Sequence, residues 1–400
     1  MKLSIDKFFI LFLSILSLFG STYFIRDFLE IGEYVYFLQI FISILICGYL
    51  IQKKPLYFFW NKIQVLKYFL VFFTVNILIQ LFYHDLSFFN QLKVFAYFLS
   101  FFSSVLVMSY LFDKEENFNF FINISRKILY LIIIFGIFNS LNLIQSNLFF
   151  VPHKEIGSYN FLFFNNTASL LEHQISYGTT IAILFSTILL IDKMVKKLFI
   201  IMCSILAIFV SFSRTAWLAM VGASFLSNLK LKNITLFVLA FFLIIIIIPN
   251  EFFFNILRIE KLGSGREVVW VYAIEMLKDN FWFGFGFSSY YDIKNIFLTD
   301  LEFELFVFES TDHLHNSYLT LIFESGIVVA LIYIFAIIKH FTNIPLSKNK
   351  NIIYYILFVF LISSFFVEFR LGGLRFFNFF FMSIIAYLLS IKTNLSPKIE

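Results

Sequence analysis

Long apolar runs alternate with short polar connections over almost the whole chain. The stretch from Val94 to Phe112 contains no charged residue and is long enough to cross the hydrocarbon layer of a membrane as a helix, which takes about 20 residues. Such runs recur about twelve times, at residues 8–25, 35–51, 66–83, 94–112, 128–145, 175–191, 198–212, 215–228, 234–249, 316–338, 352–368 and 376–391. The pattern predicts an all-α fold, a polytopic membrane helix bundle with about 12 transmembrane helices.

The composition agrees with a membrane protein. Hydrophobic residues make up 60% of the chain and charged residues 14%, a balance typical of membrane proteins. The first run, residues 8–25, lacks a small-residue cleavage site, so we expect a retained span rather than a signal peptide. Cys47 and Cys203 both fall within predicted spans and define no disulfide framework. We therefore interpret residues 1–400 as one integral membrane domain.

The placement of basic residues predicts the orientation. With both termini in the cytoplasm, 19 of the 30 lysines and arginines lie inside and 11 outside, and the opposite orientation would invert the positive-inside rule. Of seven arginines, however, only Arg126 would lie inside. Because a guanidinium can form two parallel hydrogen bonds with phosphate oxygens, an outer face rich in arginine indicates a phosphate-bearing ligand. Contact with lipid headgroups is the alternative.

Two connections on the outer side are long. The smaller, residues 145–174, ends in Glu172 and His173. The larger, residues 250–315, is the longest stretch in which charge, glycine and histidine gather. We expect it to contain short helices and to contribute to an active site. The remaining connections are short, as in compact helical bundles.

Arg214 lies between two apolar runs with almost no loop around it, in the sequence Ser-Phe-Ser-Arg-Thr-Ala-Trp at residues 211–217. A charge this close to hydrocarbon is costly unless it faces the bundle interior, a water-filled cavity or the interface. Arg214 is therefore a candidate ligand contact, and an interfacial anchor is the alternative.

Residues 264–267, Ser-Gly-Arg-Glu, have the form of a capping box and predict a helix of about fourteen residues that ends near Lys278. An anion is favoured at a helix N-terminus, and Arg266 would add a full positive charge there. Apolar residues at helical spacing predict that this helix lies on the membrane surface or packs on the span ends; they are Trp270, Ala273, Ile274 and Leu277. A capped surface helix with an exposed arginine is the alternative.

Glycines and a histidine follow this helix. Gly284-Phe285-Gly286 indicates a turn that brings the backbone close to another segment, whereas the spacing of a nucleotide-binding loop is absent. His315 stands at the entrance to the run at 316–338. Its imidazole, neutral near neutral pH, can accept a proton from a hydroxyl. An interfacial histidine is the alternative.

Further candidate substrate contacts are polar residues next to these features, namely Glu172, His173, Asn316 and Arg370. Neither His313 with His315 nor the acidic residues at 300–304 come with a convincing third type of ligand. We expect no metal and no cofactor.

Three segments, in this order, resemble the bacterial O-antigen ligase and O-antigen polymerase superfamily. They are Ser-Arg-Thr-Ala-Trp-Leu at 213–218, the segment from Gly-Arg at 265 to Gly-Phe-Gly at 286, and His-Asn-Ser-Tyr-Leu at 315–319 with Gly326. The family commonly has proline after the asparagine of the second segment, where this chain has Phe281. The resemblance covers residues 198–331 and rests on the number of spans elsewhere.

The resemblance implies a glycosyltransferase of the bacterial inner membrane, active on the periplasmic face, with an undecaprenyl-diphosphate-linked glycan as donor. By that likeness Arg214 and Arg266 hold the diphosphate, and His315 activates the acceptor hydroxyl or assists the leaving group. Fixed arginines would stabilise the negative charge that develops on the diphosphate. The implied partners are the undecaprenyl-diphosphate-linked oligosaccharide, a glycan acceptor, membrane lipid and a chain-length regulator, with no nucleic acid.

Three activities stay open. A polymerase transfers the growing chain to the next lipid-linked repeat unit, and the Gly-Arg-x-x-x-Trp form at 265–270 favours it. A ligase transfers the finished chain to lipid A core. A transporter is the third, although the polar residues gather in the outer loops and not at the membrane midplane, which favours chemistry at the interface.

Overall fold

The computed structural model is almost entirely helical in the part of the chain that it describes. That part comprises residues 4–53, 56–82, 88–143, 160–161, 164–165, 167–171, 173–190, 194–211, 213–227, 266–290, 293, 314–342, 350–367, 371, 373 and 375–395. The α-helices are α1 (Ile5–Phe19), α2 (Gly32–Lys53), α3 (Leu56–Val65), α4 (Lys67–Phe82), α5 (Phe88–Leu111), α6 (Glu115–Ser140), α8 (Gln174–Leu184), α9 (Ser186–Leu189), α10 (Met194–Val210), α11 (Arg214–Leu226), α14 (Arg266–Asn280), α17 (Ser317–Phe341), α18 (Lys350–Ser364) and α19 (Phe376–Leu395). A π-helix, η1, covers Phe24–Phe28, and strands β1 (Asn160–Phe161) and β2 (Phe164–Asn165) pair antiparallel.

Several helices are long and apolar enough to cross a membrane. Among the described residues, five meet this criterion, at Gly32–Gln52, Gln91–Leu111, Glu115–Ser140, Ser317–Phe341 and Phe376–Thr393, and α3 with α4, bent by 74°, would make a sixth. Eleven of the twelve runs predicted as spans coincide with helices, and the twelfth, 234–249, lies outside the described residues. Some of these helices are short, such as the 15 residues of α18, so the number of membrane crossings stays a prediction.

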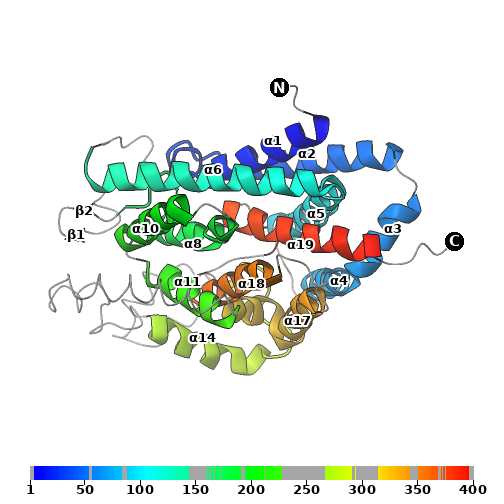
Figure 1. Ribbon diagram of the computed structural model, residues 1–400. Coiled ribbons are helices and arrows are strands. Elements are labelled where there is room, and N and C mark those ends of the chain that lie inside the picture. The colour runs from blue at the N-terminus through cyan, green and yellow to red at the C-terminus, as the bar shows by residue number, and fades with distance from the viewer. Residues whose placement is uncertain are drawn as a thin grey trace.

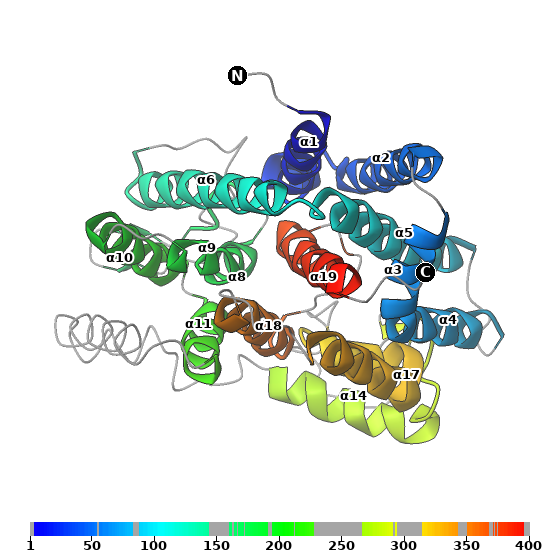
Figure 2. The ribbon, with the colours of Figure 1, turned by 45° about the vertical axis from the view of Figure 1, so that its right-hand side comes forward.

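Helix α19 forms the centre of the bundle, between α5 and α6 on one side and α18 on the other (Figures 1 and 2). Its phenylalanines are buried and stack on neighbouring helices. Phe381 stacks on Phe360 with ring centroids 3.7 Å apart, and Tyr387 stacks on Phe118 at 3.5 Å. Many of the phenylalanines therefore contribute aromatic packing to the core.

Small residues allow α8 to approach the turn that precedes α11. A Cβ atom added at Gly178 would lie 2.8 Å from the Cβ of Ala216 and 2.9 Å from that of Ser213. Such close contacts of small residues are typical of helix packing in membranes. Helix α18 packs against both α11 and α8, and the Tyr355 hydroxyl donates to the Ala182 carbonyl at 2.9 Å.

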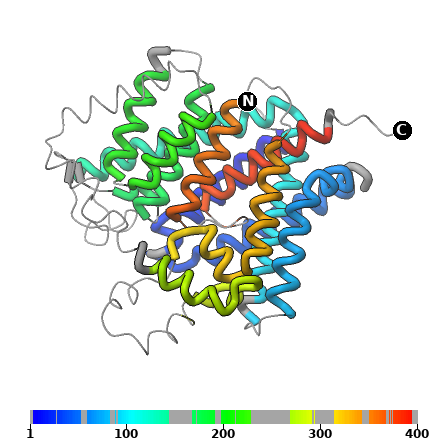
Figure 3. Tube along the Cα trace, turned by 90° about the horizontal axis from the view of Figure 1, so that it is seen from below, coloured from blue at the N-terminus to red at the C-terminus, as the bar shows by residue number. Residues whose placement is uncertain are grey.

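Helices α14 and α17 lie side by side on one flank of the molecule (Figures 1 and 2). Seen from below, α14 lies at the end of the bundle where α17 begins, opposite the end of α19 (Figure 3). Helix α17 is interrupted at Gly326, which has φ 79° and ψ 170°. This break divides α17 into a segment beside α14 and a segment that continues through the bundle.

Candidate active site

A side-chain hydrogen bond joins α14 to the residue before His315. The indole Nε1 of Trp270 donates to the main-chain carbonyl of Leu314 at 2.8 Å. Leu314 is itself buried, 1% exposed, in a small apolar cluster with residues of α14 and Phe323. Trp270 follows Arg266 by four residues, about one helical turn. The structure therefore brings the first turns of α14 to the start of α17.

The buried face of α14 differs in part from the predicted face. Ala273 and Leu277 are buried in the apolar cluster as expected and Trp270 is half-buried, but Ile274 is 54% exposed. At 100° per residue, Ala273 is the centre of a stripe that runs from Val269 to Met276, and Ile274 points away from it. The prediction for Ile274 was therefore wrong. The helix runs to Asn280, two residues beyond the predicted end.

His315 and Asn316 lie at the N-terminus of α17. The Asn316 Oδ1 accepts hydrogen bonds from the amides of Tyr318 and Leu319, both at 3.0 Å, so Asn316 is the N-cap of this helix. His315 is half-buried and has φ 51°, in the left-handed region that side chains other than glycine adopt at a cost. Strained backbone of this kind is found at functional sites.

The predicted glycine turn contacts α17 at its break. Four successive amides of the turn donate hydrogen bonds away from it: Phe285 to the Phe323 carbonyl at 2.7 Å, Gly286 to the Glu324 carbonyl at 2.9 Å, Phe287 to Gln80 Oε1 at 2.7 Å, and Ser288 to Glu324 Oε1 at 2.9 Å. In return, the Ile327 amide donates to the Phe281 carbonyl at 3.0 Å. A proline at 281 would supply the same carbonyl, so the departure from the family sequence leaves this bond possible.

Three glycines make this contact sterically feasible. Gly284 and Gly286 have φ 72° and 104°, values that glycine adopts without a Cβ clash. A Cβ at Gly326 would lie 2.0 Å from the Trp282 carbonyl oxygen, and one at Gly284 would lie 2.6 Å from the Phe323 carbonyl oxygen. The prediction that the Gly-Phe-Gly turn approaches another backbone is confirmed.

Gln80 and Glu324 are part of this arrangement, and the sequence analysis did not select them. The Gln80 Nε2 donates to the Glu324 carbonyl at 3.0 Å and to Ser325 Oγ at 3.1 Å. Gln80 is 1% exposed and Glu324 4%. The sequence does contain a signal for both residues, since each is polar or ionisable and lies within an apolar run. In membrane proteins such residues face the bundle interior and mark functional positions.

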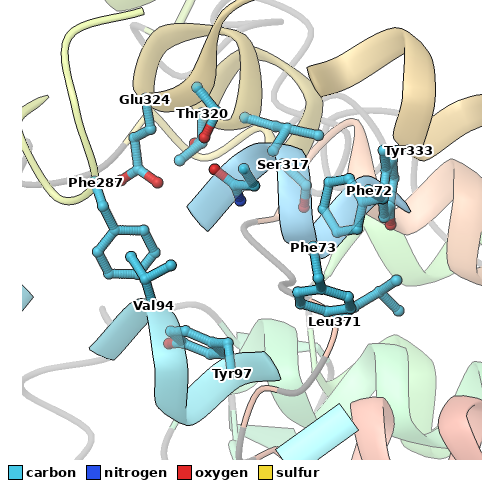
Figure 4. A pocket seen from close by; sticks show the side chains of 13 residues that line it. Phe72, Phe73, Val94, Tyr97, Phe287, Ser317, Thr320, Glu324, Tyr333 and Leu371 are labelled. Carbon is cyan, nitrogen blue, oxygen red and sulfur yellow. The ribbon is translucent and has the colours of Figure 1, made fainter. Parts of the chain in front are cut away.

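A cavity with a free volume of about 70 Å³ lies next to the start of α17. Ser317, Thr320 and Glu324 lie on the side carried by α17, and Val94 and Tyr97 of α5 lie on the opposite side (Figure 4). The full lining comprises Phe72, Phe73, Asn76, Val94, Tyr97, Phe287, Ser317, Thr320, Leu321, Glu324, Ser325, Tyr333 and Leu371. The cavity therefore combines polar groups of α17 with aromatic rings of four separate segments.

Arg214 and His173 belong to a second group of residues, at the N-termini of α11 and α8. Arg214 is the half-buried first residue of α11, after the N-cap Ser213, whose Oγ accepts from the Ala216 amide at 3.3 Å. His173 is the exposed N-cap of α8, and its Nδ1 accepts from the Ile175 amide at 3.1 Å. The contact of Gly178 with Ser213 brings the first turns of α8 beside Arg214.

Helix α18 lies between the two groups. It packs on α11 through Ile362, which approaches Gly222. The C-terminal part of α18 and the segment just after it receive two hydrogen bonds from α17: the Tyr318 hydroxyl donates to the Leu361 carbonyl at 3.0 Å, and Ser317 Oγ donates to the Val367 carbonyl at 2.7 Å. One rigid helix therefore joins the helix of Arg214 to that of His315.

The other predicted site residues are described in part or not at all. For Arg266 the structure describes the main chain, as the first residue of α14, and not the side chain. Glu172, Arg370 and His313 lie outside the described residues, as does most of the loops 145–174 and 250–315. Within the described part, no group of three or more His, Cys, Asp or Glu side chains is arranged to hold a metal ion.

The apolar helices and the strained polar site at the start of α17 define a membrane protein with a candidate active site at one end of its bundle. A comparison with family models then shows which family the chain resembles. The model described as O-Antigen ligase matches residues 199–334, about the range predicted from the motifs, and includes the segments of Arg214, Arg266 and His315. The predicted resemblance to the O-antigen ligase and polymerase superfamily is confirmed, and the chain is similar to membrane glycosyltransferases of the ligase type. A comparison with curated proteins gave no match.

Proposed function

We propose that the protein is a glycosyltransferase that acts on the periplasmic face of the bacterial inner membrane and polymerises a surface polysaccharide. The donor would be an undecaprenyl-diphosphate-linked glycan, and the acceptor the next lipid-linked repeat unit. The hydrogen bond from Trp270 to the Leu314 carbonyl carries this proposal. It holds the helix that begins with Arg266 next to His315, two residue types that such a transfer requires.

The proposed reaction uses these residues as follows. The acceptor hydroxyl attacks the anomeric carbon of the donor sugar while the bond from that carbon to the diphosphate oxygen breaks. Undecaprenyl diphosphate departs with the bonding electrons, and Arg214 and Arg266 stabilise its charge. The imidazole of His315 takes the proton of the hydroxyl. No step requires a metal ion or a cofactor.

The orientation and loop assignments belong to the same proposal. Both termini would be cytoplasmic, and the smaller loop 145–174 and the larger loop 250–315 would be periplasmic. The position of α14 at the end of the bundle where α17 begins supports a site at the periplasmic interface (Figure 3). Glu172, His173, Asn316 and Arg370 would contribute to substrate binding. A chain-length regulator would be a protein partner.

Substitutions at Arg266 test the proposal. Arg266→Ala should abolish the polymeric glycan with the protein still present in the membrane, because the leaving diphosphate loses a fixed charge. Arg266→Lys should retain part of the activity, since lysine keeps the charge but lacks the planar fork. The glycan is measured by gel electrophoresis of surface polysaccharide at matched protein levels. Full activity of Arg266→Ala would remove Arg266 from the site.

Transfer to lipid A core is the second candidate function, and the description of the matching family model as O-Antigen ligase favours it. Deletion of the gene distinguishes the two. Loss of a polymerase should leave lipid A core with a single repeat unit, whereas loss of a ligase should leave naked core and accumulated long lipid-linked chains. Unaltered surface glycan would contradict both activities.

A further inference from the structure

The cavity beside α17 has one polar wall and one aromatic wall. Its polar groups come mainly from α17, on the same side as Ser317, which is two residues from His315. Its free volume is about 70 Å³, room for part of a ligand, and small-ligand sites in proteins are concave. Such sites are mostly apolar and contain a few placed polar groups, as this one does.

Thr320 presents an unused hydroxyl to this cavity. Its side chain is 5% exposed, and Oγ1 has no hydrogen-bond partner among the residues that the structure describes. Several buried Ser and Thr hydroxyls in these helices bond to a carbonyl three or four residues earlier, as Ser204 and Thr179 do, whereas the Thr320 hydroxyl does not. A buried hydroxyl without a partner loses free energy, so a ligand that pairs with Thr320 would be favoured.

Glu324 adds a carboxyl group one turn further along the same wall (Figure 4). Its Oε1 accepts from the Ser288 amide, and its main-chain carbonyl accepts from Gly286 and from Gln80. These contacts fix the side chain at the cavity wall. A carboxyl group held in this way can accept hydrogen bonds from ligand hydroxyls. A lipid chain offers no donor for either group and would leave the carboxyl desolvated at a cost.

Aromatic rings line the rest of the cavity. Tyr97 and Phe287 face each other at a centroid distance of 5.7 Å, and Phe72 and Tyr333 pack at 5.2 Å. Aromatic surfaces of this kind bury the apolar C–H faces of a ring-shaped ligand, while the polar wall pairs with its hydroxyls. The ligand class with both properties is a sugar ring.

We propose that this cavity binds one uncharged sugar ring of the glycan acceptor, with hydroxyls paired to Thr320 and Glu324 and a C–H face on the aromatic wall. This inference rests on the proposed glycosyl transfer. Because Ser317 lines the cavity, a ring bound there would reach the start of α17, and a hydroxyl on the neighbouring sugar would lie toward His315. The cavity would thus select the acceptor and orient it.

The test measures sugar binding without turnover. The full chain in lipid nanodiscs is probed by saturation-transfer difference NMR with the methyl glycosides of glucose, galactose and N-acetylglucosamine, and with cyclohexanol as a ring of similar shape with one hydroxyl. Wild type should give a transfer signal with at least one glycoside. In Thr320→Val, which keeps the side-chain shape, the signal should fall about fivefold or more, as expected for the loss of one paired hydroxyl. Glu324→Gln, which retains an acceptor for the Ser288 amide, should also weaken it.

Ser43→Ala is the matched control. Ser43 is fully buried in α2, and its Oγ also lacks a partner within the described part of the chain, but it does not line the cavity. This variant should bind sugar as wild type does. The inference is overturned if no glycoside gives a signal, if cyclohexanol gives an equal one, or if Thr320→Val retains the wild-type signal. Sugar binding by a protein that makes no glycan would overturn the proposed function and the acceptor role of the cavity, and would leave its assignment as a sugar site.

Discussion

The indole of Trp270 and the main-chain carbonyl of Leu314 form a hydrogen bond of 2.8 Å between residues that are 44 positions apart in the chain. Because Leu314 is followed directly by His315, this bond fixes the backbone that carries the proposed base. It also fixes α14, which begins with Arg266. The relative position of an arginine and a histidine is therefore set by a third residue that need not contact the substrate.

Trp270→Phe removes this bond and keeps an aromatic ring of similar position. We expect glycan formation to fall about tenfold at an unchanged amount of protein, because the Leu314 carbonyl loses its donor and His315 its fixed backbone. The measurement is surface polysaccharide per unit of membrane protein. Trp60→Phe, at a site 61% exposed on α3, is the control and should have little effect. Equal activity of both variants would contradict the coupling.

Gly326→Ala should prevent the contact between the glycine turn and α17. The new Cβ would lie 2.0 Å from the Trp282 carbonyl oxygen, at a φ of 79° that alanine tolerates poorly. We expect loss of activity and a much lower thermal unfolding midpoint in detergent. Gly48→Ala is the control, since a Cβ there meets no atom within 4 Å and alanine favours the helix by about 1 kcal/mol. A stable, active Gly326→Ala protein would show that the break in α17 is not required.

Gln80→Met keeps the length of the side chain but removes its hydrogen bonds. The Phe287 amide would lose its buried acceptor, and such an unsatisfied group costs about 1–3 kcal/mol. The Glu324 carbonyl would lose one of its two donors and keep the Gly286 amide. We expect the unfolding midpoint to fall and activity to decline with it. Gln64→Met on α3, where the glutamine is exposed, should leave both unchanged. An unaltered midpoint in Gln80→Met would exclude a bridging role for Gln80.

Lys62 and Asp113 form an ion pair of 3.0 Å in which the lysine side chain is 1% exposed, and Lys62 also donates to the Ser109 carbonyl at 3.1 Å. Asp113→Ala should destabilise the protein by about 2–3 kcal/mol, less than the 3–5 kcal/mol for a fully buried pair because Asp113 is partly exposed. Adding Lys62→Met should recover part of this loss, because it removes the unpaired charge.

The exposed pair of Lys114 and Asp6, at 3.5 Å, provides the comparison for that prediction. Asp6→Ala should change the unfolding midpoint little, as expected for a solvent-screened pair. Denaturation in detergent, followed by tryptophan fluorescence, measures the three variants and the wild type. A double variant less stable than Asp113→Ala alone would contradict the explanation by an unpaired buried charge.

Local patterns predicted much of the helical content. Apolar runs of sufficient length coincide with helices because the backbone of a membrane protein must satisfy its hydrogen bonds internally. The capping box predicted α14 close to its observed extent, and the Gly-Phe-Gly turn indicated a close backbone contact. Ile274 was assigned to the wrong face. Its spacing from Trp270 fits one apolar stripe of the helix, but packing places the centre of the buried stripe at Ala273.

Other features depend on residues that are distant in the chain. Gln80 joins Phe287 and Glu324, which are 207 and 244 residues away. Its place within an apolar run marks a polar residue that faces the bundle interior, but no local pattern names these two partners. The sequence analysis selected Asn316 as a candidate substrate contact, and in the structure its side-chain oxygen caps α17. The same residue type suits a helix start and a polar ligand site, so the sequence alone does not separate these two roles.

The sequence by itself determined the membrane class, most helices and the resemblance to the O-antigen ligase and polymerase superfamily, since these follow from hydropathy, spacing and short motifs that act within a few turns of chain. Only the tertiary structure decided that α14 is held to the start of α17 through Trp270, that α17 breaks at Gly326, and that Thr320 and Glu324 line a cavity. These features arise because backbone groups freed at a helix break must find partners wherever the fold supplies them, and those partners come from distant segments.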